Sequence, residues 1–246
     1  MRNSKLNVLL IVLLVAMISG CVPTYVTKGT EFPRMYEETP RSILVLPPMN
    51  ESTAAEAKDY YMTTIEQPFA QMGYYVFPVE MVGEIMKQEG VYDTEVLYQM
   101  PLDKLYEYFG ADAVLFSRIK KWHVSYAVIA SSLTVTIESE IVSTKSSEKL
   151  WTYTGTIVVD LSGGDTGGGL AGLIAKAIVT AINTAAADYV KYARVANARI
   201  ITSLPSGPYH EQHMKDQSVQ IIDQTPDKAN EQTTEASTEK VSVAVQ

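Results

Sequence analysis

The sequence predicts an α/β fold, in which a β-α-β-α-α-β unit is followed by a long antiparallel hairpin and a C-terminal helix in one mixed-sheet domain. Two observations predict this class. Short apolar runs at 43–48 and 113–116, of the kind found in buried strands, are separated by segments with helical periodicity. Apolar and polar residues then alternate through most of 122–161, which indicates paired strands with one buried face.

The connection after the first strand predicts one helix and one short strand. Thr53 and Glu56 have the spacing of a capping box, and apolar residues recur from there at helical intervals. Gly73 ends this helix, and Pro68 is expected to kink it. A short strand at 74–77 follows.

Three further helices are expected before the next strand. The first ends near Gly90, and Asp93 or Thr94 can cap the second. Pro101 suits the first position of the third helix, which continues to Gly110. Helical connections between strands imply a parallel, right-handed arrangement.

The second half predicts one hairpin, with strands at 122–142 and 149–161 and a polar turn at 143–148. The residues expected on its buried face are Ile129, Leu133, Val135, Ile137, Ile141, Trp151, Tyr153, Ile157, Val159 and Leu161. A glycine-rich loop at 162–169 leads into a helix from about 170 to 199.

Composition divides the chain into a leader, a tether, a domain and a tail. We expect a signal peptide over 1–20, a lipidated cysteine and tether over 21–40, and a single α/β domain over 41–209. Packing of the tether along the domain is the open alternative, because it carries large apolar side chains. Residues 210–246 are expected to form a polar tail that lacks the apolar area needed for ordering.

The N-terminus has the layout of a signal peptide. Arg2 and Lys5 give it a positive start, and residues 6–18 are almost all apolar. This run is short for a transmembrane helix. We therefore expect cleavage before Cys21, the only cysteine of the chain.

Ile18, Ser19, Gly20 and Cys21 resemble the bacterial lipobox. The resemblance implies recognition by the lipoprotein signal peptidase, a diacylglycerol on the Cys21 thiol and an acylated new amine. Several acyl chains make a firm membrane anchor. The alternative is an uncleaved signal anchor with an incidental cysteine. Val22 stands where an aspartate would resemble an inner-membrane retention signal, so we expect the outer membrane and its periplasmic face, with surface exposure as an alternative.

Charge narrows the class of partner. The chain has a formal charge of −8, and removal of residues 1–20 leaves 18 basic against 28 acidic groups, a net charge of −10. An acidic chain lacks the basic footprint that nucleic acid requires. Protein partners in the envelope are therefore expected, and nucleic acid is not.

The motifs do not predict catalysis. Gly167, Gly169 and Gly172 match G-x-G-x-x-G, but the preceding strand belongs to an antiparallel hairpin and no second strand follows at the required distance. His210 and His213 are three residues apart, whereas the helical zinc motif needs four. We expect no enzyme activity, no cofactor and no metal.

The helix over 170–187 has a single charged residue and many small ones. It can pack in the core, form a subunit interface or enter a bilayer. Small residues at helical spacing permit close approach of a second helix. Gly172, Ala177 and Ala181 are the candidate residues for self-association as a symmetric dimer.

The lipobox at Cys21, the stretch ILVLPPMN at 43–50, the stretch GADAVL at 110–115 and the glycine-rich loop together resemble a family of bacterial lipoproteins known from meningococcal surface-antigen surveys. The resemblance covers about 18–209. The opening strand with Pro-Pro and Asn is also similar to CsgG, LpoB and the TolB amino-terminal domain.

The resemblance implies a protein-binding accessory factor in envelope assembly or secretion, with no catalytic residues. The first alternative is an LpoB-like activator of peptidoglycan synthesis, and the second is a periplasmic enzyme. A fully extended tether over 22–40 would reach about 60–70 Å, which is short for crossing the periplasm.

Overall fold

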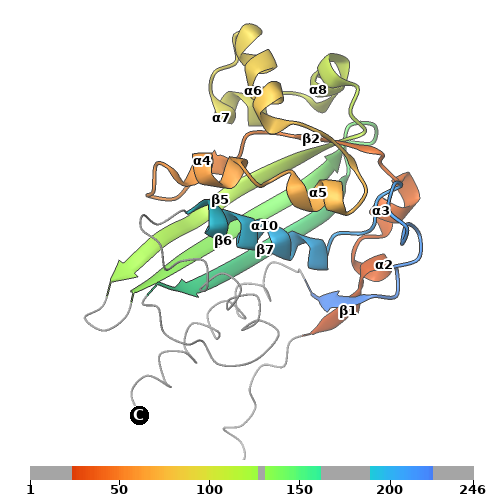
Figure 1. Cartoon of the computed structure of the whole chain (residues 1–246). Coiled ribbons are helices and arrows are strands. Elements are labelled where there is room, and N and C mark those ends of the chain that lie inside the picture. The colour runs from red at the N-terminus through yellow and green to blue at the C-terminus, as the bar shows by residue number, and fades with distance from the viewer. Residues whose placement is uncertain (1–23, 127–130, 162–188, 224–246) are drawn as a thin grey trace, which may run out of the picture.

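The computed structural model describes residues 24–126, 131–161 and 189–223 as a mixed sheet with helices on both faces (Figure 1). The elements in chain order are β1 (Tyr25–Thr27), α2 (Lys28–Glu31), α3 (Pro33–Glu38), β2 (Ser42–Val45), β3 (Met49–Asn50), α4 (Ala57–Met62), α5 (Gln67–Gln71), β4 (Tyr75–Phe77), α6 (Val79–Gln88), α7 (Thr94–Tyr98), α8 (Leu102–Phe109), β5 (Ala113–Tyr126), β6 (Ser131–Ser143), β7 (Lys149–Asp160), α10 (Val190–Ala198), the 3-10 helix η1 (Arg199–Thr202) and β8 (Gln220–Ile222).

The main sheet combines a parallel half with an antiparallel half. Its strand order is β4-β2-β5-β6-β7, and β3 also pairs with β5. The pairs of β2 with β4 and with β5 are parallel, whereas β5, β6 and β7 pair antiparallel. A separate two-stranded ribbon joins β1 to β8. The predicted α/β class with a mixed sheet is confirmed.

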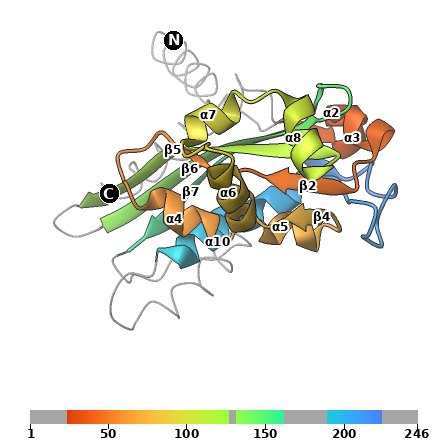
Figure 2. The ribbon, with the colours of Figure 1, turned by 90° about the horizontal axis from the view of Figure 1, so that it is seen from above.

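Strand β2 separates two hydrophobic cores, which explains its unbroken apolar sequence. Ile43 and Val45 face one core, and Leu44 and the following Leu46 face the other, all fully buried. Such runs are typical of strands covered on both faces. Figure 2 shows α4, α5 and α10 on one side of the sheet and α7 and α8 on the other.

Helices α6 and α8 belong to the second core. Val82 and Met86 of α6 and Leu105 of α8 pack there against β2 and β5. Gly110 ends α8 in the left-handed conformation, with φ of 66°, as the sequence predicts. Pro101 lies at the N-cap of α8 rather than inside its first turn.

The predicted helix over 53–72 is wrong as a single element, because it is divided into α4 and α5. Pro68 lies in the first turn of α5, where the missing N–H costs nothing. The expected capping box does not form, since the Asn50 side chain organises this turn instead. It accepts from Ser52 and donates to the Ala54 carbonyl, so the helix begins later, at Ala57.

The antiparallel half has three long strands rather than the expected two. Strand β5 extends to Tyr126, and β6 begins at Ser131. The region from 126 to 131 contains no Gly, Pro, Asn or Asp, so the sequence carries only a weak turn signal there, at Ser131. A register shift between Ile119 and Lys121 also changes the alternation within β5.

The predicted facing of the later strands is confirmed. The fully or almost fully buried residues are Leu133, Val135, Ile137, Ile141, Trp151, Tyr153, Ile157 and Val159, and Leu161 packs at the core margin. Ile129 lies outside the described residues. Alternation identified these side chains because one face of β6 and β7 meets the helices and the other does not.

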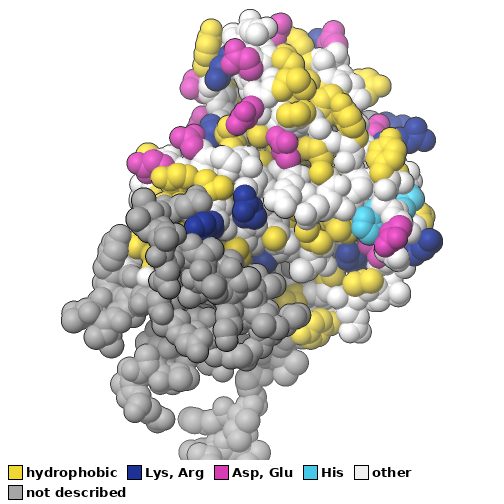
Figure 3. Space-filling model, in the orientation of Figure 1, with side chains coloured by type: hydrophobic (Ala, Val, Ile, Leu, Met, Phe, Trp, Pro, Cys, Tyr) yellow, Lys and Arg dark blue, Asp and Glu magenta, His cyan; other side chains and the backbone are white. Residues whose placement is uncertain are grey.

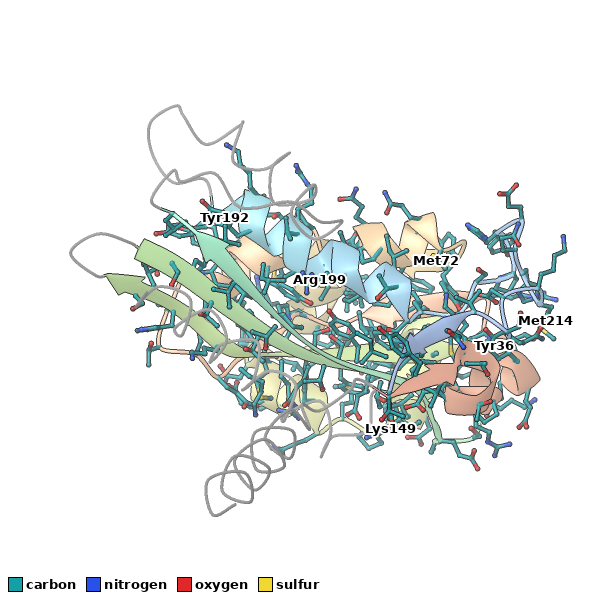
Figure 4. All side chains as sticks on the ribbon, turned by 90° about the horizontal axis from the view of Figure 1, so that it is seen from below. Tyr36, Met72, Lys149, Tyr192, Arg199 and Met214 are labelled. Carbon is teal, nitrogen blue, oxygen red and sulfur yellow. The ribbon has the colours of Figure 1, made fainter. Side chains whose placement is uncertain are left out.

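Both ends of the domain extend beyond the expected limits of 41 and 209. Phe32 and Met35 are buried, so the segment expected as a tether packs on the domain from Thr24 onward, as the open alternative proposed. Residues 210–223 also pack, with Ile221 buried and β8 paired to β1. Seen from below, Tyr36 lies close to the segment that carries Met214 (Figure 4).

Candidate functional site

The residues predicted to carry function lie outside the described part of the chain. This holds for the lipobox residues Ile18, Ser19, Gly20 and Cys21, for the glycine-rich motif, and for Gly172, Ala177 and Ala181. Anchoring and self-association therefore stay predictions. The candidate binding site in the described part of the chain consists of residues that no sequence motif marks.

His210 and His213 take part in local hydrogen bonds. The Nδ1 atom of His210 accepts from the Gln212 amide at 3.1 Å, and Nδ1 of His213 lies 3.0 Å from the Ser206 carbonyl oxygen. Across 24–126, 131–161 and 189–223 no three potential metal ligands come together. The helices in these ranges are all too short or too polar to span a bilayer.

A cleft opens at the carboxyl ends of β2 and β4. These strands are neighbours and parallel, but the chain leaves them toward opposite faces of the sheet. It passes from β2 to α4, which packs in the first core, and from β4 to α6, which packs mainly in the second. Such a change of direction leaves a crevice, the usual place for ligands in open α/β sheets.

The cleft has a volume of about 390 Å³ and lies between α4, α6 and α7. Its apolar floor includes Met62, Met86 and Leu97. Its rim is mostly acidic and contains Asp59, Glu80, Glu84 and Asp93 together with Lys58 and Lys87. The two lysines are engaged, since Lys58 donates to the Thr94 hydroxyl and Lys87 lies 3.8 Å from Glu84.

Beside the cleft lies an exposed apolar surface, which we call the α6–α8 surface. Its members are Tyr75, Met81, Tyr92, Val96, Tyr106 and Tyr108, each between 47% and 75% exposed. Figure 3 shows hydrophobic side chains gathered over this upper part of the molecule, with carboxylates among them. Exposed apolar groups that gather in one area are typical of binding surfaces.

Aromatic contacts hold part of this surface in place. The ring centroids of Tyr75 and Phe77 are 5.2 Å apart, and those of Phe77 and Phe109 are 6.2 Å apart. Tyr108 continues the row at 6.4 Å from Phe109. Rings in contact lose little conformational entropy when a partner covers them.

The same region is strongly acidic. Residues 79–109 contain seven acidic and two basic residues, a net charge of −5. Sequence inspection could have found this cluster and noted the tyrosines of the first half. It could not have shown that β4, α6, α7 and α8 present them together, because that depends on the order of strands in the sheet.

At the other end of the domain, a buried ion pair joins the first and last segments of the described part of the chain. The Lys28 ammonium donates to the Leu204 carbonyl at 2.7 Å and lies 3.3 Å from Asp216 Oδ2. The Tyr36 hydroxyl donates to Asp216 at 3.0 Å, and Ser206 donates through its amide and hydroxyl at 2.9 and 3.0 Å.

Electrostatics at this pair favour a charged carboxylate. Burial alone raises the pKa of Asp216, but Lys28 and the Ser206 and Tyr36 donors outweigh it and hold the pKa below its usual value. Burial lowers the pKa of Lys28, an effect that Asp216 opposes. The pair is a fully bonded structural link, because its polar atoms are satisfied within the domain.

Comparison with known proteins identifies the class. The GNA1162-like lipoprotein family matches residues 30–208, and the chain belongs to this family. The lipoprotein NMB1124/NMB1162 of Neisseria meningitidis serogroup B is 31% identical over 152 residues, which are 62% of this chain and 70% of that one. The predicted family resemblance is confirmed.

A solved structure of the family agrees with this membership. The crystal structure of lipoprotein GNA1162 from Neisseria meningitidis is 31% identical, with a TM-score of 0.50 over 58% of this chain and 98% of that chain. The LpoB C-terminal domain from Salmonella enterica is 16% identical, with a TM-score of 0.33 over 53% of this chain and 95% of that chain. Similarity as low as that to LpoB carries no argument about function.

Proposed function

We propose that this protein is a lipoprotein anchored through Cys21 on the periplasmic face of the outer membrane, where it binds a partner protein in envelope assembly or secretion. Membership of a lipoprotein family supports the anchor, as do the lipobox residues. The protein acts by binding rather than by catalysis.

The α6–α8 surface carries the proposal. It combines exposed aromatic and aliphatic side chains with a local net charge of −5. Tyrosine contributes a large apolar body and a polar tip, which suits surfaces that are covered on association. The acidic groups favour a basic partner, because complementary charge speeds encounter and excludes acidic proteins.

The location of this surface suits an anchored protein. Figure 1 shows β1, the element nearest to Cys21 in the sequence, at one end of the domain and α6–α8 at the other. A partner can therefore reach the α6–α8 surface while Cys21 is held in a membrane.

The alternative of an LpoB-like activator is less well supported. The described part of the chain begins at Thr24, three positions after Cys21. Three residues span about 10 Å at most. An anchored domain on so short a connection stays close to its own membrane and does not reach far across the periplasm.

A photo-crosslinking amino acid in place of Tyr92 tests the proposal in intact cells. Tyr209 is the matched control, since it is 69% exposed, against 75% for Tyr92, but lies outside the α6–α8 surface. We expect position 92 to capture one defined envelope protein and position 209 to capture much less of it. Adding Asp93→Asn with Glu95→Gln should reduce the capture if charge guides the partner. Equal capture from both positions would contradict the proposal.

A further inference from the structure

We propose that the β1–β8 ribbon is a membrane-contact face that lies against the lipid headgroups, with Tyr25, Val219 and Ile222 as its contact residues. The inference rests on the proposed anchoring through Cys21 and goes further, because it fixes which face of the domain meets the bilayer.

The three residues are exposed apolar side chains along the ribbon. Tyr25 of β1 is paired directly with Ile222 of β8, and the two side chains are 57% and 44% exposed. Val219, which is 45% exposed, precedes β8 at the other end of the ribbon, where its carbonyl accepts from the Lys28 amide at 2.9 Å. Side chains this exposed contribute little to the core, so core packing does not explain why these positions are apolar.

The ribbon is also free of charge. Neither β1 nor β8 contains an acidic or basic residue. The flanking Lys28 and Asp223 are each only 5% exposed, and Lys28 is paired with Asp216. An acidic protein is repelled by anionic lipids, so an uncharged face is the one that can approach them most closely. Tyrosine is enriched at the level of the headgroups because its side chain is amphipathic.

The short connection between Cys21 and β1 identifies the bilayer as the partner of the ribbon face. Thr24 directly precedes β1 and is three positions after Cys21, which allows about 10 Å at most between the two. An acylated Cys21 must therefore hold the ribbon within about that distance of the membrane surface. The Asp223 amide donates to the Thr24 carbonyl at 2.9 Å, so the second strand is held at the same edge.

A small apolar face of this kind binds lipid weakly by itself, so it acts as an orienting contact that adds to the acyl anchor. The tilt that it sets places α6–α8 on the side away from the bilayer, since the two lie at opposite ends of the domain (Figure 1).

Lipid quenching of an added tryptophan tests the face directly. The chain beginning at Cys21 can be coupled through its only thiol to a maleimide-headgroup lipid in phosphatidylcholine vesicles with brominated acyl chains. Tyr25→Trp is the reporter and Tyr92→Trp is the control, because both positions are exposed and both chains keep the buried Trp122 and Trp151. We expect bromine to quench the reporter severalfold more than the control, and Ile222→Glu to reduce that difference.

Equal quenching of the two tryptophans would overturn the inference, and so would a reporter that is shielded by a second copy of the chain instead of by lipid. Chemical coupling makes this result independent of acylation in the cell. A failure of the proposed anchor would therefore be seen separately, in the mass of the native protein.

Discussion

Lys28 and Asp216 are 188 residues apart in the sequence and both are 5% exposed. Nothing in the local sequence marks either residue, because Lys28 lies in a short segment without periodicity and Asp216 in a polar one. Their partnership depends on the packing of both chain ends on the same core. Long-range polar contacts of this kind cannot be predicted from sequence patterns with a period of two or of 3.6 residues.

Replacing Lys28 with methionine should destabilise the domain by about 3–5 kcal/mol, because it leaves Asp216 as a buried charge without its ammonium partner. Chemical unfolding measures this loss. Lys87→Met is the matched control, since the Lys87 side chain is 56% exposed and a surface ion pair contributes only about 0–1 kcal/mol. Equal losses in the two variants would show that the buried pair does not stabilise the fold.

Asp216 also predicts a loss of stability in acid. Its pKa is below the ordinary 3.8 in the folded protein, so on acidification the unfolded chain takes up this proton first. The stability that charged Asp216 contributes to the fold is present above about pH 4 and is lost as the pH falls through the folded-state pKa. Urea unfolding between pH 2 and about pH 6 should show a shallower pH dependence in Asp216→Asn than in the parent.

Strand β6 is the central strand of the antiparallel half and shows how far alternation predicts an element. Its buried residues were identified correctly because one face meets the helices. The start of β6 was not, since no glycine, proline, asparagine or aspartate marks it in the sequence and the register of β5 shifts near Ile119. Periodicity therefore predicts facing well where a strand is regular, and strand ends poorly where turn residues are absent.

Ile137→Asp should unfold the domain or destabilise it by several kcal/mol, because Ile137 is 1% exposed and the carboxylate would be buried without a partner. Thr136→Asp changes the other face of β6, where the side chain bonds to Thr156 at 2.9 Å. Its cost should stay near about 1 kcal/mol. Circular dichroism during urea unfolding separates these outcomes, and similar losses would mean that the facing of β6 is wrong.

On the scale of the whole molecule, the segments 24–40 and 210–223 complete the domain by packing on its central unit and pairing with each other. Truncation after Asp223 keeps the β1–β8 ribbon and should leave the melting temperature within about 2 °C of the parent, because residues 224–246 offer little apolar area. Truncation after Lys215 removes both Asp216 and β8. That variant should melt at least about 5 °C lower, and an unchanged melting temperature would show that the link is dispensable.

The site was less predictable than the fold. The lipobox is defined by four consecutive residues, so the sequence alone predicts it. The α6–α8 surface and the ribbon face combine residues from several elements, and their exposure depends on which helices cover which side of the sheet. Tyrosines in the first half indicated association in general terms, but Tyr61 is fully buried and Tyr92 is 75% exposed, a difference that the sequence does not show.

Mass spectrometry of the protein extracted from its own membranes tests the central claim, the anchor at Cys21, most directly. The account predicts that residues 1–20 are absent and that the N-terminal peptide begins at Cys21 with a diacylglycerol and an acylated amine. In Cys21→Ser this lipid-modified peptide should disappear. A native chain that keeps residues 1–20, or that begins at an unmodified Cys21, would contradict the account.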